Sequence, residues 1–189
     1  SLEKIDPGNE FAIAALVQLL QSQNLDESTR WQAASSLEKI GTGNEFAIAT
    51  LVQLLQSQNL DESTRRQAAE SLGKIDPGNE IAIAALVQLL QSQNLDESTR
   101  RQAAESLGKI DPGNEIAIAA LVQLLQSQNL DESTRRQAAE SLGKIDPGNE
   151  IAIAALVQLL QSQNLDESTR WQAASSLEKI DPGNEFAIA

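Results

Sequence analysis

One 35-residue unit repeats along the whole chain, and this repeat limits the possible folds more than any other feature of the sequence. The string LVQLLQSQNLDESTR begins at five positions, spaced 35 residues apart: Leu16, Leu51, Leu86, Leu121 and Leu156. The units are 6–40, 41–75, 76–110, 111–145 and 146–180, with partial units at 1–5 and 181–189. The third and fourth units are identical. Repeats of this length predict one supersecondary element per unit, stacked into a single array over residues 1–189.

The pattern within a unit indicates two helices. In the third unit, Pro77 and Gly78 suit the centre of a type II turn, and Asn79 suits the N-cap of a first helix. Five apolar residues then share one face of that helix: Ala82, Ile83, Leu86, Leu89 and Leu90. Asp96 is the expected N-cap of a second helix that ends at Ile110. The alternation IAIA alone resembles a strand, but the longer helical pattern outweighs it.

A single pair of helices is not expected to be stable alone. It buries too few large aliphatic side chains to offset the conformational entropy lost when its residues are ordered. Neighbouring units must therefore cover both sides of each pair, as in an α-solenoid. We predict an all-α fold, a right-handed α-solenoid of stacked helical hairpins with open ends.

The composition argues against several classes of function. The chain has no cysteine and no histidine, and so lacks thiolate ligands, the commonest metal ligand and the commonest general base. Its formal net charge of −13, from 14 Lys and Arg against 27 Asp and Glu, disfavours nucleic-acid binding. The sequence shows no membrane-spanning apolar run and no signal-peptide pattern. We therefore expect a cytoplasmic protein with no membrane, metal or cofactor partner.

The polar residues of the unit do not form a catalytic pattern. Asp26 and Glu27 begin a second helix, where N-capping and the helix dipole explain them. The LDES spacing does not match a calcium loop, and DPGNE does not match a phosphate loop. Ser28 and Thr29 lack a His or a suitably placed Lys that would activate a hydroxyl. We expect no enzymatic activity.

The second helix resembles the HEAT-like repeat, in particular the short prokaryotic form that is also found in phycobilin lyases. The matching residues are Arg100, the small pair Ala103 and Ala104, and the segment 107–110, LGKI. The unit departs from the family pattern in a longer internal turn that contains Leu95, and in a Thr where the family has Val before the Arg. The resemblance implies a concave face lined by second helices, and a recognition role within a larger bacterial, especially cyanobacterial, protein.

Three positions of the second helix change together among the units. The segments 28–40 and 168–180 read STRWQAASSLEKI, whereas the three middle units read STRRQAAESLGKI. At about 100° per residue, all three positions lie opposite the core direction of the helix, so we predict that they share one exposed stripe. Arg and Glu in the middle units are spaced to form an i,i+4 ion pair.

The exposed stripe is the candidate binding site for a protein or peptide with acidic or aromatic residues, because exposed Trp and Arg are enriched at binding hot spots. Its first row holds Trp31, Arg66, Arg101, Arg136 and Trp171, and its second row holds Ser35, Glu70, Glu105, Glu140 and Ser175. Tolerated surface variation is the alternative explanation. The remaining differences, Phe11 and Phe46 for Ile, Gly41 and Thr42 for Asp and Pro, and Thr50 for Ala, are predicted to be packing or turn variants.

The sequence therefore predicts a non-catalytic repeat scaffold that presents an extended surface for protein or peptide binding. Two alternatives stay open: a purely structural or engineered self-assembling array, and a phycobilin-lyase-like activity implied by the family resemblance. Because neither end of the array carries a polar capping unit, we also expect head-to-tail association between copies.

Overall fold

The computed structural model describes residues 8–22, 24–57, 60–92, 95–127, 130–145, 147–163, 165–184 and 186. Within these residues the chain forms ten α-helices and no β-strand. The helices are α1 (Glu10–Leu20), α2 (Glu27–Ile40), α3 (Glu45–Gln56), α4 (Glu62–Ile75), α5 (Glu80–Leu90), α6 (Glu97–Ile110), α7 (Glu115–Leu125), α8 (Glu132–Leu142), α9 (Glu150–Leu160) and α10 (Glu167–Ile180). The partial unit predicted at 1–5 lies outside the described residues, as does most of the segment after Asn184.

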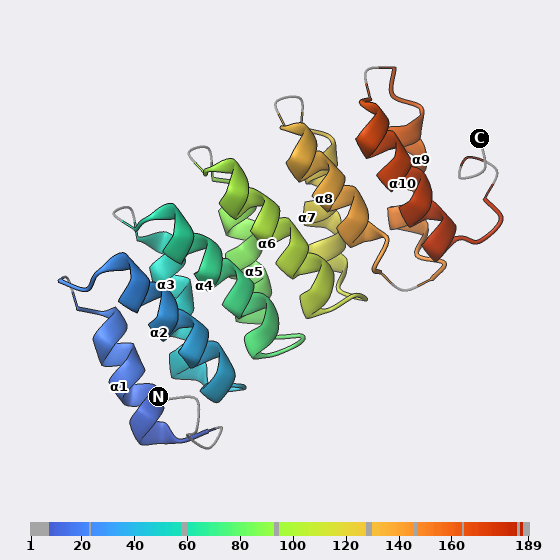
Figure 1. Ribbon diagram of the computed structural model, residues 1–189. Helices are drawn as coiled ribbons and strands as arrows, with labels where there is room; N and C mark the ends of the chain where they lie inside the picture. The colour runs from blue at the N-terminus through green and yellow to red at the C-terminus, as the bar shows by residue number, and fades with distance from the viewer. Residues whose placement is uncertain are drawn as a thin grey trace.

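The helices pair into five hairpins, which we number 1 to 5 from α1–α2 to α9–α10 (Figure 1). Each first helix has an asparagine N-cap: Asn79 Oδ1, for example, accepts the N–H of Ala82 at 3.1 Å. Each second helix has an aspartate N-cap, and Asp96 Oδ1 accepts the N–H of Thr99 at 2.7 Å. Both predicted N-caps of the third unit are therefore confirmed.

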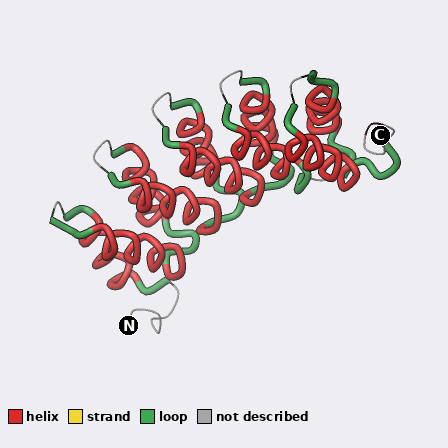
Figure 2. The backbone as a smooth tube through the Cα atoms, turned by 45° about the horizontal axis from the view of Figure 1, so that its top comes forward, coloured by secondary structure: helices red, strands yellow, loops and turns green. Residues whose placement is uncertain are grey.

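The hairpins stack into a curved array with two layers. Successive second helices (α2, α4, α6, α8 and α10) pack extensively against one another, whereas successive first helices touch less. The closer approach of the second helices places them on the concave side of the curve (Figure 2). We refer to the second helices as the inner layer and to the first helices as the outer layer. The predicted all-α solenoid of stacked helical hairpins is confirmed.

Equivalent aliphatic side chains form the core of every hairpin. The first helices contribute a buried leucine each, among them Leu51, Leu86 and Leu121, and the second helices contribute Leu72, Leu107 and Leu142. The pair Ala103 and Ala104 is completely buried in α6. Such small side chains let neighbouring helices approach closely, which explains the dense inner layer.

A turn glycine joins the beginning of a hairpin to its end. Gly78 precedes α5 with a φ of 80°, a conformation that favours glycine. Its N–H donates to the carbonyl oxygen of Ile110, the last residue of α6, at 2.8 Å. The same bond recurs from Gly8 to Ile40, from Gly43 to Ile75 and from Gly148 to Ile180. It satisfies a carbonyl that the helix itself leaves without a partner.

Candidate functional site

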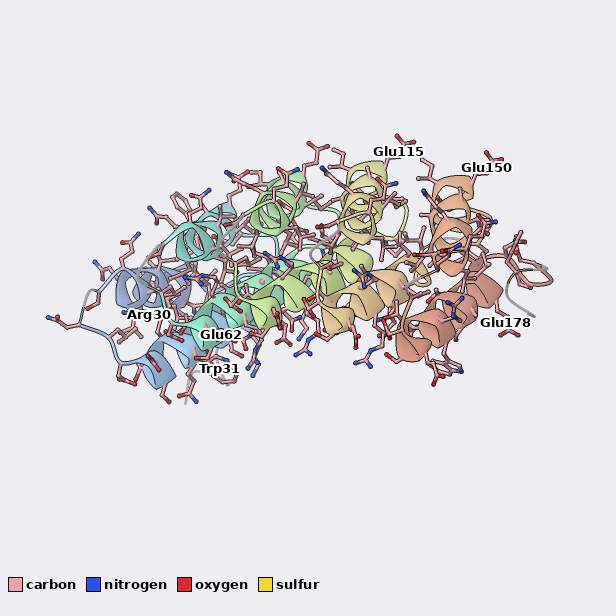
Figure 3. The ribbon with its side chains drawn as sticks, turned by 90° about the horizontal axis from the view of Figure 1, so that it is seen from above. Arg30, Trp31, Glu62, Glu115, Glu150 and Glu178 are labelled. Carbon is pink, nitrogen blue, oxygen red and sulfur yellow. The ribbon has the colours of Figure 1, made fainter. Side chains whose placement is uncertain are left out.

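The first row of the candidate site lies on the exposed side of the inner layer, and we call it the inner ladder: Trp31, Arg66, Arg101, Arg136 and Trp171. All five side chains are exposed, as predicted, with Trp31 at 40% and Trp171 at 70%. Figure 3 shows Trp31 on the side of the array away from Glu115 and Glu150 of the outer layer. The array thus brings together five residues that lie 35 positions apart in the sequence.

The arginine that precedes each ladder residue has a different role. The guanidinium of Arg65 donates to the carbonyl oxygen of Leu60 at 3.0 Å and lies 3.4 Å from Asp96 of the next hairpin. Arg135 donates in the same way to the carbonyl oxygen of Leu130, and Arg30, Arg100 and Arg170 donate to carbonyl oxygens at or just after the end of the preceding first helix. These bonds hold the turn between the two helices, which explains why this arginine is the same in every hairpin. Among the described residues, the adjacent Arg66 has no such partner.

The second row of the candidate site is half-buried, and its glutamates do not pair with the ladder arginines. Glu70 instead forms an ion pair with Lys74 at 2.5 Å, one turn further along α4. Glu105 pairs with Lys109 and Glu140 with Lys144 in the same way. Lysine thus occupies the i+4 position relative to each glutamate, the favoured orientation on a helix. The ladder guanidiniums are left uncompensated by these carboxylates.

At the third changing position the prediction of exposure is wrong in hairpins 1 to 4, whereas Glu178 of hairpin 5 is exposed, as predicted. Gly73, Gly108 and Gly143 are buried and lie against Ser106, Ser141 and Ser176 of the next hairpin. A Cβ added to Gly108 would lie 2.6 Å from the Cβ of Ser141, closer than side chains tolerate. The position points away from the core of its own hairpin, but the following second helix covers it. It is a packing position between hairpins.

In hairpin 1 the same position holds Glu38, which makes a polar contact across the interface instead. The hydroxyl of Ser71 donates to Glu38 Oε2 at 3.1 Å, and Lys74 Nζ lies 3.9 Å from Glu38 Oε1. Partial burial raises the pKa of the Glu38 carboxyl above its ordinary value, although Lys74 and the Ser71 hydrogen bond act in the opposite direction. The Glu/Gly difference therefore changes how two hairpins meet.

Phe11 and Phe46 are not packing variants either. Their side chains are 91% and 77% exposed, and the isoleucines at the equivalent positions are also exposed. Thr50, by contrast, is buried, and its hydroxyl donates to the carbonyl oxygen of Phe46 at 2.7 Å. Gly41 is buried at the C-cap of α2. The prediction of packing or turn variants thus agrees with the structure for Thr50, Gly41 and Thr42, the last of which lies in the turn before α3.

The recurrent acidic residues serve helix ends. Partial burial acts to raise the pKa of the Asp96 carboxyl, but hydrogen bonds from Thr99 and Ser98 outweigh it and lower the pKa. The pKa values of the other four aspartate N-caps, Asp26, Asp61, Asp131 and Asp166, are lowered as well. Across the described ranges, no cluster of three or more Asp and Glu residues is arranged to hold a metal ion. The same part of the chain contains no helix that is long and apolar enough to cross a membrane.

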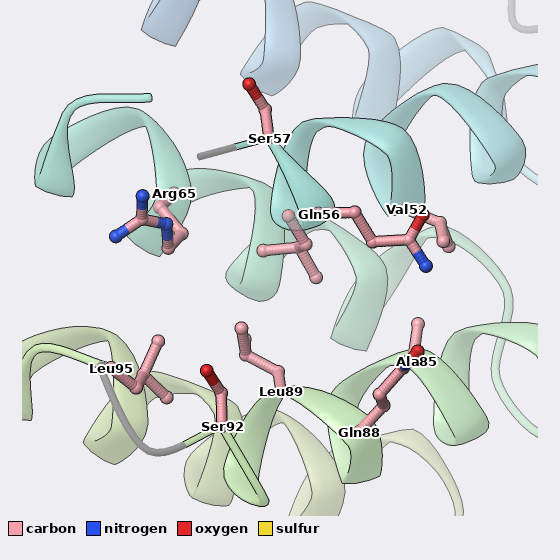
Figure 4. Close-up of a pocket in the computed structure, with 10 residues that line it drawn as sticks. Val52, Gln56, Ser57, Arg65, Ala85, Gln88, Leu89, Ser92 and Leu95 are labelled. Atoms are coloured by element: carbon pink, nitrogen blue, oxygen red, sulfur yellow. The ribbon is translucent and has the colours of Figure 1, made fainter. Parts of the chain in front are cut away.

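Grooves that the sequence analysis did not predict separate neighbouring first helices. The groove between α3 and α5 has a volume of about 670 Å³ (Figure 4). Val52, Leu89 and Leu95 contribute to its apolar part, and Arg65 enters from the inner layer. Similar grooves of about 410 and 610 Å³ lie between α5 and α7 and between α7 and α9. They result from the curvature of the stack, which the pattern within one unit does not reveal.

Comparisons with known proteins agree with this architecture. The family described as HEAT repeats matches residues 48–132, and the PBS lyase HEAT-like repeat matches residues 134–162. None of the curated proteins that were compared with the chain matches it.

Among solved structures, an engineered protein from the Northeast Structural Genomics Consortium is 32% identical, with a TM-score of 0.55; the match covers 89% of this chain and 78% of that one. The complex of CpcE and CpcF of phycocyanin lyase from Nostoc sp. PCC7120 is 18% identical, with a TM-score of 0.64, and the match covers 88% of this chain and 98% of that one. The second likeness concerns the fold alone. Together with the repeated helical hairpins, these matches identify a repeat scaffold, and the chain belongs to the HEAT-like repeat proteins.

Proposed function

We propose that the chain is a non-catalytic recognition scaffold whose inner ladder binds an acidic, aromatic-containing segment of a partner protein. The observation that carries the proposal is the row of three exposed guanidiniums on successive helices, left unpaired by the glutamates of the second row. HEAT repeats generally mediate protein interactions, which favours this role over a purely structural one.

The chemistry of the ladder selects the kind of partner. Arginine binds carboxylates through two parallel hydrogen bonds, so Arg66, Arg101 and Arg136 suit a segment with several Asp or Glu residues. Trp31 and Trp171 flank the arginines and offer exposed aromatic surface to Phe, Tyr or Trp of the same segment. Helices in contact lie about 8–10 Å apart. A peptide in the polyproline II conformation rises about 3.1 Å per residue with three residues per turn, so an acidic residue at every third position places one carboxylate beside each successive second helix, all on one face of the peptide.

A binding measurement with a defined peptide tests this proposal. The probe is a fluorescent peptide with Asp at every third position and Phe near each end, titrated with the protein and followed by anisotropy. The triple variant Arg66→Ala, Arg101→Ala, Arg136→Ala is expected to bind at least about ten-fold more weakly, since hot-spot arginines each contribute more than ~1 kcal/mol.

A matched variant separates specific recognition from overall charge. Arg66→Lys, Arg101→Lys and Arg136→Lys keep the net charge but replace each planar guanidinium with a single ammonium group. This control is expected to lose most of the affinity that the alanine variant loses, because the two parallel hydrogen bonds to each carboxylate are no longer possible. Full affinity in the lysine variant, or no binding by the unaltered chain, contradicts the proposal.

The lyase-like alternative has a separate test. The match to the phycocyanin lyase complex is a likeness of fold, and the aspartates of the second helices are occupied as N-caps. Bilin mixed with the purified chain is therefore expected to give no covalent adduct, and an adduct would overturn the non-catalytic assignment. Head-to-tail association of copies stays a prediction, and light scattering at increasing protein concentration checks it.

A further inference from the structure

A second exposed row lies on the outer layer, and we call it the outer row: Phe11, Phe46, Ile81, Ile116, Ile151 and Phe186. The exposed fractions of these side chains range from 39% to 91%. Five of them occupy the second residue of a first helix. Ile83, two residues after Ile81, is 1% exposed, so isoleucine in the same helix is either fully packed or presented to solvent. Single exposed apolar residues are normal on a protein surface, but here the same exposed apolar position recurs on every first helix of the array, which points to a use of the row as a whole.

The charge around the outer row has a single sign. Each of the five first helices begins with an exposed glutamate directly before the apolar residue: Glu10, Glu45, Glu80, Glu115 and Glu150. Their sequences contain no lysine and no arginine. Figure 3 shows Glu115 and Glu150 on the outer side of α7 and α9. The outer surface of these helices is therefore apolar and acidic.

This charge distribution decides between possible occupants. A second copy of the chain docked through the same row would bring the glutamates of the two copies together, and like charges across an interface disfavour association. A partner that carries basic residues beside its apolar ones is attracted by the glutamate at the start of each first helix. The complementary partner is a segment of another protein that combines large apolar residues with Lys or Arg.

The repeat spacing suits a helical segment. Packed helices lie about 8–10 Å apart, and the first helices, which touch one another less than the second helices do, lie at the upper end of this range or slightly beyond it. Seven residues of an α-helix rise about 10.5 Å. A partner helix that lies across the outer row therefore places one apolar residue from each heptad beside each successive first helix. We propose that the outer row binds a basic amphipathic helix of a partner protein, on a surface separate from the inner ladder and of opposite preference.

A peptide of defined sequence tests the proposal. The probe is a synthetic helix of four heptads, with leucine on one face and lysine beside it, and its binding is followed by anisotropy. The variant Ile81→Ser, Ile116→Ser, Ile151→Ser is expected to weaken binding at least about ten-fold, because apolar anchors dominate such grooves and rows. Since these side chains are exposed, the variant should unfold at the same urea concentration as the unaltered chain.

Two further measurements keep the result interpretable. A peptide with Glu in place of Lys is expected not to bind, and the variant Glu80→Gln, Glu115→Gln, Glu150→Gln is expected to bind the lysine peptide more weakly and with less dependence on salt. The inner-ladder variant Arg66→Ala, Arg101→Ala, Arg136→Ala should retain the affinity for the lysine peptide, so failure here is distinct from failure of the proposed function. Unchanged binding by the serine variant, or equal binding of both peptides, overturns the proposal. Sedimentation that shows self-association of the unaltered chain, abolished in the serine variant, overturns it in favour of a second copy.

Discussion

In the inner layer, neighbouring helices approach so closely that Gly108 lies against Ser141 of the next hairpin, whereas in the outer layer a groove separates α5 from α7. The two layers also differ in what they expose. The inner layer presents the arginines and tryptophans of the inner ladder beside exposed glutamates and lysines, whereas the outer row presents isoleucine and phenylalanine beside glutamate and no basic residue. In one repeated sequence, the second helices therefore determine how closely the hairpins pack, and each layer also carries an exposed row of different chemistry.

The largest expected effect contrasts a packed inner-layer residue with an exposed outer-layer residue. Leu107→Ala, at a side chain that is 1% exposed, should lower the free energy of unfolding by about 2–5 kcal/mol, through lost burial and the cavity it leaves. Ile116→Ala, at a side chain that is 62% exposed, should change it by less than about 0.5 kcal/mol. Urea unfolding measures the free energy of unfolding of both variants. A similar decrease in the two variants would contradict the difference in packing between these two positions.

The close approach within the inner layer predicts the next effect. Gly108→Ala adds a Cβ at 2.6 Å from the Cβ of Ser141, and relieving that contact should cost about 1–3 kcal/mol. Alanine otherwise favours a helix interior over glycine by about 1 kcal/mol, so a net loss identifies crowding. A double-mutant cycle with Ser141→Gly provides the control, because the cost of Gly108→Ala should shrink in that background. A stabilising Gly108→Ala would show that the layers are not packed differently.

Two adjacent arginines of the inner layer should differ by a smaller amount. Arg65→Ala removes the bond to the Leu60 carbonyl and the contact with Asp96, and should destabilise the array by about 1–2 kcal/mol. Arg66→Ala removes an exposed side chain and should stay within about 0.5 kcal/mol. Thermal and urea unfolding of the two variants compare them directly, and equal effects would contradict the distinction between a structural and a free arginine.

The smallest effect concerns acid, because the inner-layer helices have aspartate N-caps and the outer-layer helices have asparagine N-caps. Partial burial acts to raise the pKa of Asp166, but hydrogen bonds from Thr169 and Ser168 outweigh it and lower the pKa from 3.8 to about 2. A group with a lowered folded-state pKa stabilises the fold above its unfolded pKa, and this contribution is lost as the pH falls through the folded-state value. Stability should therefore decline as the pH is lowered from 3.8 to about 2.

An Asp→Asn exchange provides the control for the acid effect. Asparagine is also a good N-cap but does not titrate. The variant carries the exchange at Asp26, Asp61, Asp96, Asp131 and Asp166, and its unfolding free energy should decline less on the acid side. An unchanged pH profile would mean that the inner-layer N-caps do not carry the acid sensitivity.

The sequence predicted the helices, their N-caps and the stacking, because these depend on patterns within one unit, such as the apolar face of Ala82, Ile83 and Leu86. The prediction that Gly108 is exposed was wrong, because a helical wheel locates the core of one hairpin only. It gives no information about the next hairpin, which covers the opposite side of the helix. The sequence also placed Phe11 and Phe46 among the packing or turn variants, although both are exposed, since apolar character alone does not say which side of a helix is covered. The inner ladder was placed correctly because exposed positions opposite the core depend on the wheel alone.

The bond from the turn glycine to the end of its hairpin bears on how the array changes length. Gly78 and Ile110 lie within one 35-residue stretch, as do Gly43 and Ile75. When recombination adds or removes a whole stretch, donor and acceptor are gained or lost together, and no buried backbone group is left without a partner. A change that removes only the part of a stretch that holds the glycine, or only the part that holds the isoleucine, leaves the other without its partner. The bond therefore allows the number of hairpins to change in steps of 35 residues.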